Sequence, residues 1–560
     1  MLRRSPLTLA ARGAAGYVDQ LDRLGEGTAM QRSLRLRSAL LLSGVLVGLA
    51  ACSSAGKTDD GGSKQATDAT IPTLTYGLEA IPPTLDVANN YSSADMAVMG
   101  LVTQPLEIAN LDGTFTPVLA EKVSEPDRTT LVYDLRKDAT FSDGSPLTAD
   151  DVVWTVEHLR GATTQTVSEL TNFDTVRATG EHQVTITLKR PNNAMRGSFA
   201  IISFVQEATS AEAAGDDLGT PQAPPIGTGP YVVDSFDASG VTLKRNDEYV
   251  GEKPAPDEVR FTAITDDTAA QLAMRSGELD LYPLIDVKTT KTWGSVPGAE
   301  TYSTQTLYVD YVTMNMSVKP FDDIHVRRAV AYATDVTGLI QANYGGEADE
   351  PVAITPVQII DRLAPDAAAV SDLTAPFDQV AYDMDKAEAE LAQSAYPDGF
   401  TAEYEYYSPQ GKIVGLSLAE NLKQIGITLE LKSRRINDFI GDLFVNKVPD
   451  IGFFSIAAVV PDPASWYVYL VGKDNPYNAA RYSTAQTEAA LAVINESDDD
   501  AARWEAMKTI TTAFADDIPY VGLAQSNFVV AAADGVTFTE DPDFMEMSTG
   551  DWVNNIKSTK

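Results

Sequence analysis

Cysteine and histidine are almost absent from this chain of 560 residues, which holds one cysteine, Cys52, and three histidines. A disulfide within the chain is therefore excluded. The histidines, His158, His182 and His325, lack the paired spacing of a metal site. We accordingly expect no bound metal and no cofactor.

Positive charge is also in short supply. The sequence carries 42 lysines and arginines against 79 aspartates and glutamates, a formal net charge of −37. A surface this acidic repels nucleic acid and anionic lipid headgroups. No basic stripe with interleaved aromatic residues offsets the repulsion, so we expect no nucleic-acid partner.

Long hydrophobic runs are missing except near the N-terminus. Residues 31–53 read QRSLRLRSALLLSGVLVGLAACS, in which arginines precede a short apolar run. This order is typical of a secretory signal, and the run is short for a membrane span. The ending LAAC, residues 49–52, resembles a bacterial lipobox, in which the peptide is cut before the cysteine and the cysteine is acylated. We predict a signal region over 1–51 and a lipid on Cys52; the alternative is an ordinary cysteine in an ordinary signal.

The segments on either side of this signal carry two further predictions. Residues 1–29 contain no apolar run and Met30 directly precedes the signal, so we predict that translation starts at Met30. Residues 52–70 are small, polar and rich in glycine and serine, which is typical of a flexible tether. No later apolar stretch is long enough to cross a bilayer, so only the lipid would hold the body to a membrane.

The rest of the chain alternates strand and helix patterns. TLVYDLR, residues 130–136, alternates as a half-buried strand, and TADDVVWTVEHLR further on predicts a helix. Thr148 is the expected N-cap, with Asp151 as its capping-box partner. Residues 232–246 predict a hairpin. A strand, a helix ending at Gly277 and a second strand predict a βαβ unit.

Two further segments are assigned from composition and pattern. Residues 206–226 hold many Ala, Gly and Pro, which predicts a loop crossing between two parts of the protein. Residues 322–346, DDIHVRRAVAYATDVTGLIQANYGG, predict one continuous helix, acidic at its start and stopped by the two final glycines.

The stretch PIGTGPYVVDSF, residues 225–236, spaces Gly227 and Gly229 as in a nucleotide-binding loop. That fingerprint needs a third glycine where a helix starts, but Val232 stands there and the next residues alternate as a strand. Pro230 also removes a backbone N–H that an anion would use. We therefore interpret the stretch as a tight turn in which the glycines allow positive φ.

Five segments, in order, resemble the family 5 extracellular solute-binding proteins of bacterial ABC importers, which include oligopeptide, dipeptide and nickel binders. They are VLAEKVSEPDRTTLVYDLRKDATFSDGSPLTADDVVWTVEHL, IGTGPYVVDSF with KRNDEYVGEKPAPDEVRF, SGELDLY, KPFDDIHVRRAVAYATD and YDMDKAEAELAQSAYPDG. The resemblance implies an α/β fold of the type II periplasmic-binding-protein kind, with two lobes joined by hinge strands and an additional domain on the first lobe.

The resemblance also divides the chain. It implies lobe I at 71–108, 222–308 and 525–560, the additional domain at 109–221, and lobe III at 309–524. The chain would cross the hinge near residues 313–315 and 522–525. Ligands of such proteins bind between the lobes, and closure buries them.

The position of the ligand is implied in the same way. In the peptide binders it lies between a segment after the first strand, here ANNYSS, and the loop after a late lobe III strand, here FFSIAAVVPDPASWYV. Backbone groups of such segments can hold an extended peptide as in strand addition. The ligand-binding residues predicted in this way are Tyr91, Ser92, Ser93, Tyr407, Ser455, Ala457, Val459, Asp462 and Trp466.

One position departs from the family pattern. Peptide-binding relatives often carry an aspartate three positions before the acidic-Pro pair, where it binds the free amino terminus of the ligand, but Val459 stands there in this chain. A buried amine without a counter-ion is costly, so a free-amine peptide needs another partner, and Asp462 is the candidate. Trp466 is as consistent with a core position as with the pocket.

The resemblance implies a substrate-binding lipoprotein on the extracytoplasmic face of the cell membrane. It would capture oligopeptides or peptide-like solutes and deliver them, as a monomer, to permease subunits and their ATPase. The alternatives are the same class binding a metal chelate, an oligosaccharide or an opine-like solute, and a peptide-sensing lipoprotein without transport. No GxSxG motif occurs and the histidines lie in framework segments, so we expect no enzymatic activity.

Overall fold

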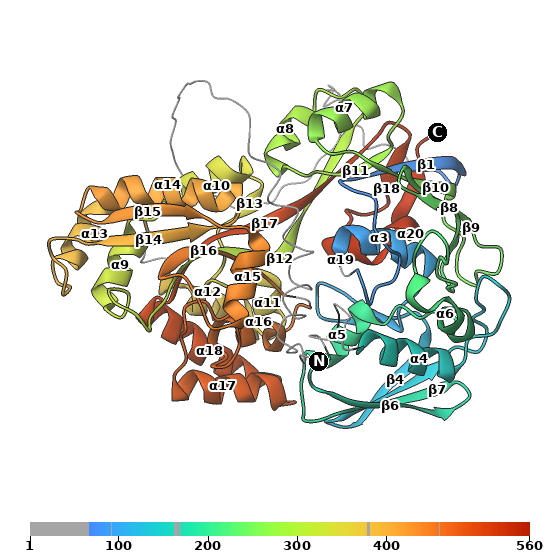
Figure 1. Cartoon of the computed structure of the whole chain (residues 1–560), viewed down its shortest axis with the longest axis horizontal. Coiled ribbons are helices and arrows are strands. Elements are labelled where there is room, and N and C mark those ends of the chain that lie inside the picture. Colours follow the sequence, from blue (N-terminus) through green and yellow to red (C-terminus); the bar gives the residue numbers. More distant parts are fainter. Residues whose placement is uncertain (1–65, 91, 162–165, 167–169, 378–380, 459) are drawn as a thin grey trace, which may run out of the picture.

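A computed structural model describes residues 66–90, 92–161, 166, 170–377, 381–458 and 460–560. Among them the central feature is an 11-stranded mixed sheet with strands in the order β15-β14-β16-β12-β17-β11-β1-β10-β9-β8, and β13 paired to β17 off this path. Its two longest strands, β12 (Glu300–Met314) and β17 (Tyr520–Ala532), pair antiparallel and run from one lobe into the other (Figure 1). The predicted two-lobed α/β fold is confirmed.

Lobe I is built around β1, which lies between the parallel strands β10 and β11. The helix between them, α7, is capped by Asp266 and ends at Gly277 with φ 75°, so the predicted βαβ unit is confirmed. The elements of lobe I are β1 (Ile71–Leu78), α3 (Ser93–Val102), β8 (Tyr231–Asp237), β9 (Gly240–Arg245), β10 (Pro256–Ala263), α7 (Asp267–Ser276), β11 (Leu281–Pro283), η3 (Val287–Thr289), α8 (Thr290–Trp293), β18 (Val536–Phe538), α19 (Phe544–Thr549), α20 (Trp552–Asn555) and β19 (Ile556–Ser558).

The additional domain is a four-stranded antiparallel sheet, β4-β5-β7-β6, with helices beside it (Figure 1). The predicted capping box is present, because the Thr148 N–H donates to the Asp151 carboxylate at 2.9 Å and starts α4. The elements are β2 (Glu107–Ala109), β3 (Phe115–Pro117), β4 (Ala120–Asp127), β5 (Thr130–Leu135), α4 (Ala149–Leu159), β6 (Phe173–Gly180), β7 (Gln183–Leu188), α5 (Met195–Ile202), α6 (Ala208–Ala214) and η2 (Gly215–Asp217).

Lobe III carries the other end of the large sheet and most of the helices. Its strands β14 and β15 are parallel, and β14 adds to β16, which pairs with β12. The elements are α9 (Ile324–Tyr332), α10 (Val336–Tyr344), β13 (Ala348–Asp349), α11 (Val357–Asp361), α12 (Ala367–Thr374), α13 (Met384–Leu391), β14 (Thr401–Tyr406), α14 (Pro409–Lys423), β15 (Thr428–Ser433), α15 (Ile436–Phe444), β16 (Ile451–Ala457), α16 (Pro463–Val471), α17 (Ala485–Glu496) and α18 (Asp500–Asp517).

Two sequence predictions about these segments are wrong. The single helix predicted over 322–346 is two helices, because the Asp335 side chain accepts from the Gly338 N–H at 3.0 Å and starts α10 as a new helix. The loop predicted over 206–226 contains α6, which the Glu207 side chain caps. In both places a carboxylate beside a free backbone N–H starts a helix that composition did not reveal.

The reason given for Gly227 and Gly229 is also wrong. Both lie outside the positive-φ region, so neither is needed for a left-handed conformation. Instead they pass against the backbone at the end of α3: a Cβ on Gly227 would lie 2.1 Å from the Val102 carbonyl oxygen, and one on Gly229 would lie 2.4 Å from the Leu101 carbonyl oxygen. The glycines permit close packing of two backbone segments. The hairpin after them, β8–β9, is confirmed.

The N-terminal predictions lie largely outside the described residues. These include the signal region 1–51, the start at Met30, the lipidated Cys52 and most of the tether. Thr67 is described, and its N–H donates to the Ser558 carbonyl at 2.8 Å before β1 begins. The domain boundaries drawn from the resemblance stay predictions.

The additional domain contacts lobe III across the space between the lobes. The Asn193 side-chain amide donates to the Ile494 carbonyl at 2.8 Å and to the Ser497 carbonyl at 2.7 Å. The Arg128 guanidinium donates to the Asn193 side-chain oxygen and, at 3.2 Å, to the Glu496 carbonyl. The acceptors lie at the C-terminal end of α17, where helix carbonyls lack intrahelical partners. We call Asn193 and Arg128 with these carbonyls the clasp.

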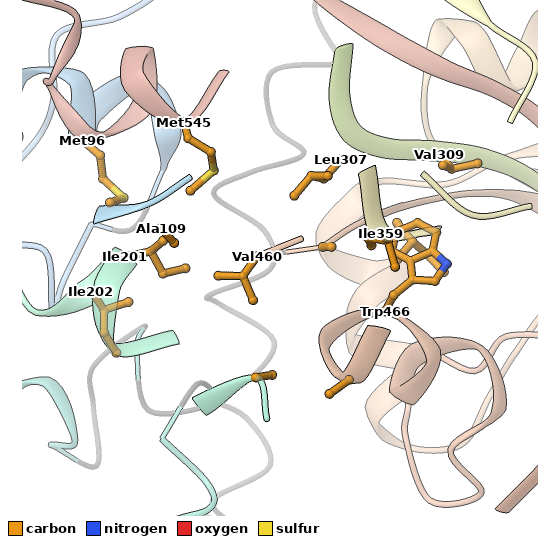
Figure 2. Packing of buried hydrophobic residues seen from close by; sticks show 14 of the residues in the cluster. Met96, Ala109, Ile201, Ile202, Leu307, Val309, Ile359, Val460, Trp466 and Met545 are labelled. Atoms are coloured by element: carbon orange, nitrogen blue, oxygen red, sulfur yellow. The ribbon is translucent and has the colours of Figure 1, made fainter. Parts of the chain in front are cut away.

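An apolar contact lies beside the clasp. Val460 of lobe III reaches the additional domain at Gly197, where a Cβ would lie only 2.5 Å from a Val460 methyl carbon. Figure 2 shows Val460 between Ile201 of the additional domain and Ile359 and Trp466 of lobe III. The two sides of the molecule therefore meet through packed side chains as well as hydrogen bonds.

The clasp can be tested with Asn193→Ala. The change removes two hydrogen bonds between the additional domain and lobe III, which together contribute about 1–3 kcal/mol. We expect the variant to populate a more open form, seen as a larger radius of gyration in solution scattering. Thr179→Ala, on the exposed side of the same domain, is the matched control. An unchanged radius for Asn193→Ala would show that the clasp does not hold the lobes together.

Candidate binding site between the lobes

A cavity of about 220 Å³ lies between the lobes, on one face of the central sheet. Lobe I contributes residues of β1, β11, α3 and α19, and lobe III contributes residues of α10, α14 and β16. Residues of β12 and β17, the strands that join the lobes, complete its wall. Because its wall is drawn from both lobes, any change in their relative position changes the cavity.

Strand alternation decides which side chains reach this cavity. Thr306, Tyr308 and Asp310 are spaced by two along β12 and therefore lie on the same face. On the neighbouring strand β16, Phe453 and Ser455 share that face, and Ser455 pairs directly with Asp310. The ladder between β12 and β17 shifts register between Gln305 and Val309 and again between Asp310 and Tyr311, and such irregularities re-aim side chains.

Asp310 is a buried carboxyl of the cavity wall with a raised pKa. Its side chain is 8% exposed and accepts hydrogen bonds from the hydroxyls of Tyr344 and Ser455. Burial raises its pKa from 3.8 to about 6, while the two hydrogen bonds act in the opposite direction. Burial and the nearby Asp310 charge raise the pKa of Tyr344 well above its usual range. The pKa of Asp310 therefore lies close to physiological pH values.

Tyr407 holds the strand segment that carries Ser455, one of the hydrogen-bond partners of Asp310. Its ring is buried, and its hydroxyl oxygen accepts from the Ser455 backbone N–H at 2.9 Å. Burial raises the pKa of Tyr407, which keeps the hydroxyl neutral. Tyr407 thus fixes the strand segment that carries Ser455, whose own hydroxyl holds Asp310.

The remaining wall is mainly aromatic. The Tyr308 and Phe544 rings pack edge to face with centroids 6.3 Å apart, and Phe528 packs on Phe544 at 5.8 Å. Such rings offer apolar area together with a negative face that attracts cations. The aromatic residues that line the cavity are Tyr76, Tyr308, Tyr344, Phe453, Phe528 and Phe544.

The charged groups of the wall are acidic. Glu79 of lobe I joins Asp310 as a second carboxylate, and the described lining contains no lysine, arginine or histidine. Two further lining residues, Gln410 and Asn527, carry buried amide oxygens without a hydrogen-bond partner within the described ranges. The wall as a whole is suited to hydrogen-bond donors and positive charge.

A second cavity, of about 370 Å³, lies between the additional domain and lobe III, next to the clasp. Several of its charged side chains are paired with one another. Arg503 binds both carboxylate oxygens of Asp462, at 2.6 and 2.8 Å, and Arg196 binds Glu107 at 2.7 Å. Because these ion pairs satisfy each other, we place the candidate site in the cavity beside β12 and β17.

The predicted ligand-binding residues fall in different places. Ser455 lines the candidate cavity, Tyr407 lies behind it, and Ala457 lies two residues along the same strand. Ser92 caps α3 through the Asp95 N–H and lines neither cavity. Contact of these residues with a ligand stays a prediction.

Asp462 lies in the second cavity, where it also caps α16 by accepting from the Ala464 N–H at 2.8 Å. Its charge is balanced by Arg503, so it is poorly placed to receive an additional amine. Trp466 is fully buried, and its ring lies 6.4 Å from that of Tyr311, the residue next to Asp310 on β12. Trp466 therefore packs on the sheet face opposite Asp310. Its contact with a ligand, like that of Asp462, stays a prediction.

Several predictions fall on positions that the structure does not describe. Tyr91 and Val459 lie outside the described residues, and only the backbone of Ser93 is described. The sequence missed Asp310 and Tyr344. The available signal was one acidic residue within the otherwise apolar strand LYVDYVTMNM. Tyr344, at the end of a helix, gave no signal of its own.

Two of the three described histidines, His158 and His325, lie beside carboxylates. His158 lies 2.9 Å from the Asp86 carboxylate, and His325 lies 2.7 Å from the Glu390 carboxylate. Within the described ranges no group of three metal-ligating side chains gathers. The absence of a metal and of a cofactor stays a prediction. Of the described helices, none is both long and apolar enough to cross a bilayer.

The family model and two of the relatives that match this chain describe bacterial solute-binding proteins. Residues 114–478 match the family described as "Bacterial extracellular solute-binding proteins, family 5 Middle". The chain is 29% identical over 315 residues to a putative ABC transporter peptide-binding protein of Brucella ovis, covering 54% of this chain and 57% of that protein. The chain thus aligns with little more than half the length of this relative.

Two further similarities extend over more of the chain. The probable D,D-dipeptide-binding periplasmic protein DdpA of Escherichia coli K12 is 25% identical over 475 residues, which is 82% of this chain and 89% of the relative. The solved structure of AgaA of A. tumefaciens R10 in complex with agropinic acid matches with a TM-score of 0.70 at 23% identity, covering 87% of this chain and 98% of that one. This last similarity concerns the fold.

The raised pKa of Asp310 predicts that Asp310→Asn stabilises the protein above pH 6. The folded protein holds the Asp310 proton more tightly than the unfolded chain, so stability is lost as the pH rises from about 4 through 6. The rise from 3.8 to about 6 corresponds to roughly 3 kcal/mol at pH 8. Urea unfolding at pH 8 compares the free energy of unfolding of the wild type and of Asp310→Asn. The same comparison at pH 4 is the control. A variant less stable than the wild type at pH 8 would contradict it.

Proposed function

Because the chain belongs to the bacterial extracellular solute-binding proteins of family 5, we propose that it is the substrate-binding component of an ABC importer. It captures small peptides or peptide-like solutes between its lobes and releases them unchanged to a membrane permease driven by an ATPase. It catalyses no reaction of its own.

One observation carries this proposal. The candidate cavity draws its wall from both lobes and from the two strands that join them, so closure of the lobes both forms and buries it. The clasp and the Val460 contact stabilise the closed arrangement at the far side of the same space. A binding protein that encloses its solute and later opens requires this combination.

The size of the cavity favours small solutes. Pockets for drug-sized ligands typically measure about 300–1,000 Å³. The candidate cavity, at about 220 Å³, is below that range and suits a solute of dipeptide size. The names of the Brucella and E. coli relatives, which refer to peptides and to D,D-dipeptides, point in the same direction. An anionic, opine-like solute is less suited to a wall with two carboxylates and no basic residue among the described lining.

The location of the protein is part of the proposal. The arginines, apolar run and LAAC ending of residues 31–53 support export, cleavage before Cys52 and a lipid on that cysteine. The mature protein is then held at the extracytoplasmic face of the cell membrane, beside its permease. Two or three acyl chains are sufficient for stable anchoring, whereas one chain binds reversibly.

Binding of a small peptide is expected to be measurable directly. Mass spectrometry of the protein under native conditions should detect a guest of dipeptide size after purification from cells, in keeping with a cavity smaller than a drug-sized pocket. Calorimetry against pooled dipeptides, and against sugars and metal chelates, identifies the class. No guest and no heat with any pool would overturn the proposal. Heat with sugars alone would replace peptides as the solute.

The anchor is tested with Cys52→Ser. Without the thiol no lipid can be attached at this position, so the protein should move from the membrane fraction to the soluble extracytoplasmic fraction while still binding its solute. Deletion of the gene should abolish uptake of that solute, which separates transport from sensing alone. Retention of Cys52→Ser in the membrane fraction would contradict the proposed anchor.

A further inference from the structure

We propose that the cavity between the lobes selects a small organic cation, a protonated amine on an apolar body, with Asp310 as its counter-ion. This inference rests on the proposed function and specifies the solute class. It assigns to Asp310, on a strand that joins the lobes, the binding of the amine. Asp462, which the sequence suggested for this role, is paired with Arg503.

The first argument is the uncompensated charge of Asp310. Two neutral hydroxyls, from Tyr344 and Ser455, are its hydrogen-bond partners, and neither supplies positive charge. No basic residue contributes to its electrostatic surroundings or appears among the described lining residues. A buried carboxylate without a cation is costly, and natural proteins retain such groups mainly at functional sites. The missing partner is one that the solute brings.

The second argument is the shape of the rest of the wall. Tyr308, Phe528 and Phe544 form an aromatic part of the wall, and their ring faces attract an ammonium group as well as apolar atoms. The buried amide oxygens of Gln410 and Asn527 add acceptors. An ammonium group has three N–H donors and no acceptor, so it matches a wall of this composition.

The third argument is the lack of basic side chains in the described lining. A zwitterionic solute also carries a carboxylate, which requires an arginine, a lysine or several backbone N–H donors when buried. The described lining offers no basic side chain, and it contains Glu79 in addition to Asp310. The amine is therefore the group that the cavity recognises, whether it belongs to the amino end of a peptide or to a simple amine.

The surroundings of Asp310 also predict how the affinity depends on pH. Tyr344, Tyr404 and Tyr407 face it from α10 and the end of β14, and burial raises the pKa of each above its usual range. β17 presents Ala524 opposite it. A proton and the ammonium group compete for the same carboxylate, so affinity falls as the pH drops below about 6, by up to tenfold per pH unit.

One other group titrates in a similar range. Glu546 of α19 has a pKa raised to about 7 by burial, and its backbone N–H and side chain are engaged with Asp543. Because Glu546 is present in both the wild type and an Asp310 variant, the difference between their pH profiles isolates Asp310.

The test uses four probes that each carry one phenyl ring, with the purified protein. Ala-Phe amide carries only the amine charge, N-acetyl-Ala-Phe carries only the carboxylate, Ala-Phe carries both, and phenethylamine is a simple amine. Calorimetry compares the wild type with Asp310→Asn, which keeps the shape of the side chain and removes its charge. The matched control is Asp280→Asn, a carboxylate in lobe I outside the cavity that accepts from the Thr75 N–H at 2.8 Å.

We expect Ala-Phe amide or phenethylamine to bind at least tenfold more tightly than N-acetyl-Ala-Phe, and Asp310→Asn to lose at least tenfold in affinity for that amine. Tighter binding of the amide indicates a peptide amino end, and tighter binding of phenethylamine indicates a simple amine. Asp280→Asn should bind as the wild type does, and the affinity of Asp310→Asn should lose the decline below pH 6.

Two results would overturn the inference. If N-acetyl-Ala-Phe binds as tightly as the amines, or if Asp310→Asn binds the amine unchanged, the cavity does not select a cation through Asp310, while the importer function stands. If no probe binds and no guest is found by mass spectrometry, the proposed function fails together with the inference. The unfolding curve of Asp310→Asn shows whether a loss of binding reflects a loss of structure.

Discussion

The antiparallel pairing of β12 with β17 is the constraint on which both lobes depend. The two strands belong to a single sheet that continues into each lobe, so the lobes share one hydrogen-bonded ladder. The ladder is regular at its ends and shifts register between Gln305 and Val309 and again between Asp310 and Tyr311. These irregularities fall where the strands pass along the cavity. A bend in the ladder at this place moves the lobes and the cavity wall together.

The same strand presents two very different surfaces. On one face of β12, Tyr311 packs against Trp466 and Tyr520 in the continuous core, and its hydroxyl donates to the Ile354 carbonyl. On the other face Asp310 is buried among hydroxyls. Aromatic packing dominates the first face and stabilises the fold, whereas a carboxylate lacks its cation on the second. Departures from good packing and pairing of this kind are expected where a protein interacts with something else.

The parts of the fold that the sequence predicted are those set by local contacts. The capping box of Thr148 and Asp151, the hairpin β8–β9 and the helix ending at Gly277 all depend on residues a few positions apart. The break at Asp335 was missed because apolar periodicity continues through it, although a single side-chain cap is sufficient to start a new helix. The glycines at 227 and 229 were explained by the wrong cause because their neighbour, the end of α3, is distant in sequence.

The candidate site could be predicted only in outline for the same reason. Family resemblance led to Ser455 and to the segment around Asp462, but the network of Asp310, Tyr344 and Ser455 joins three segments more than thirty residues apart. No periodicity or motif links them. Asp462 looked available in the sequence, and its partner Arg503 lies forty-one positions further on.

The pairing of Thr67 with Ser558 has a mechanical consequence. These residues join the start of the described chain to β19, near the C-terminal end of lobe I. A force on the chain at Thr67 is therefore transmitted to lobe I, so rotation of lobe III about β12 and β17 does not act against it.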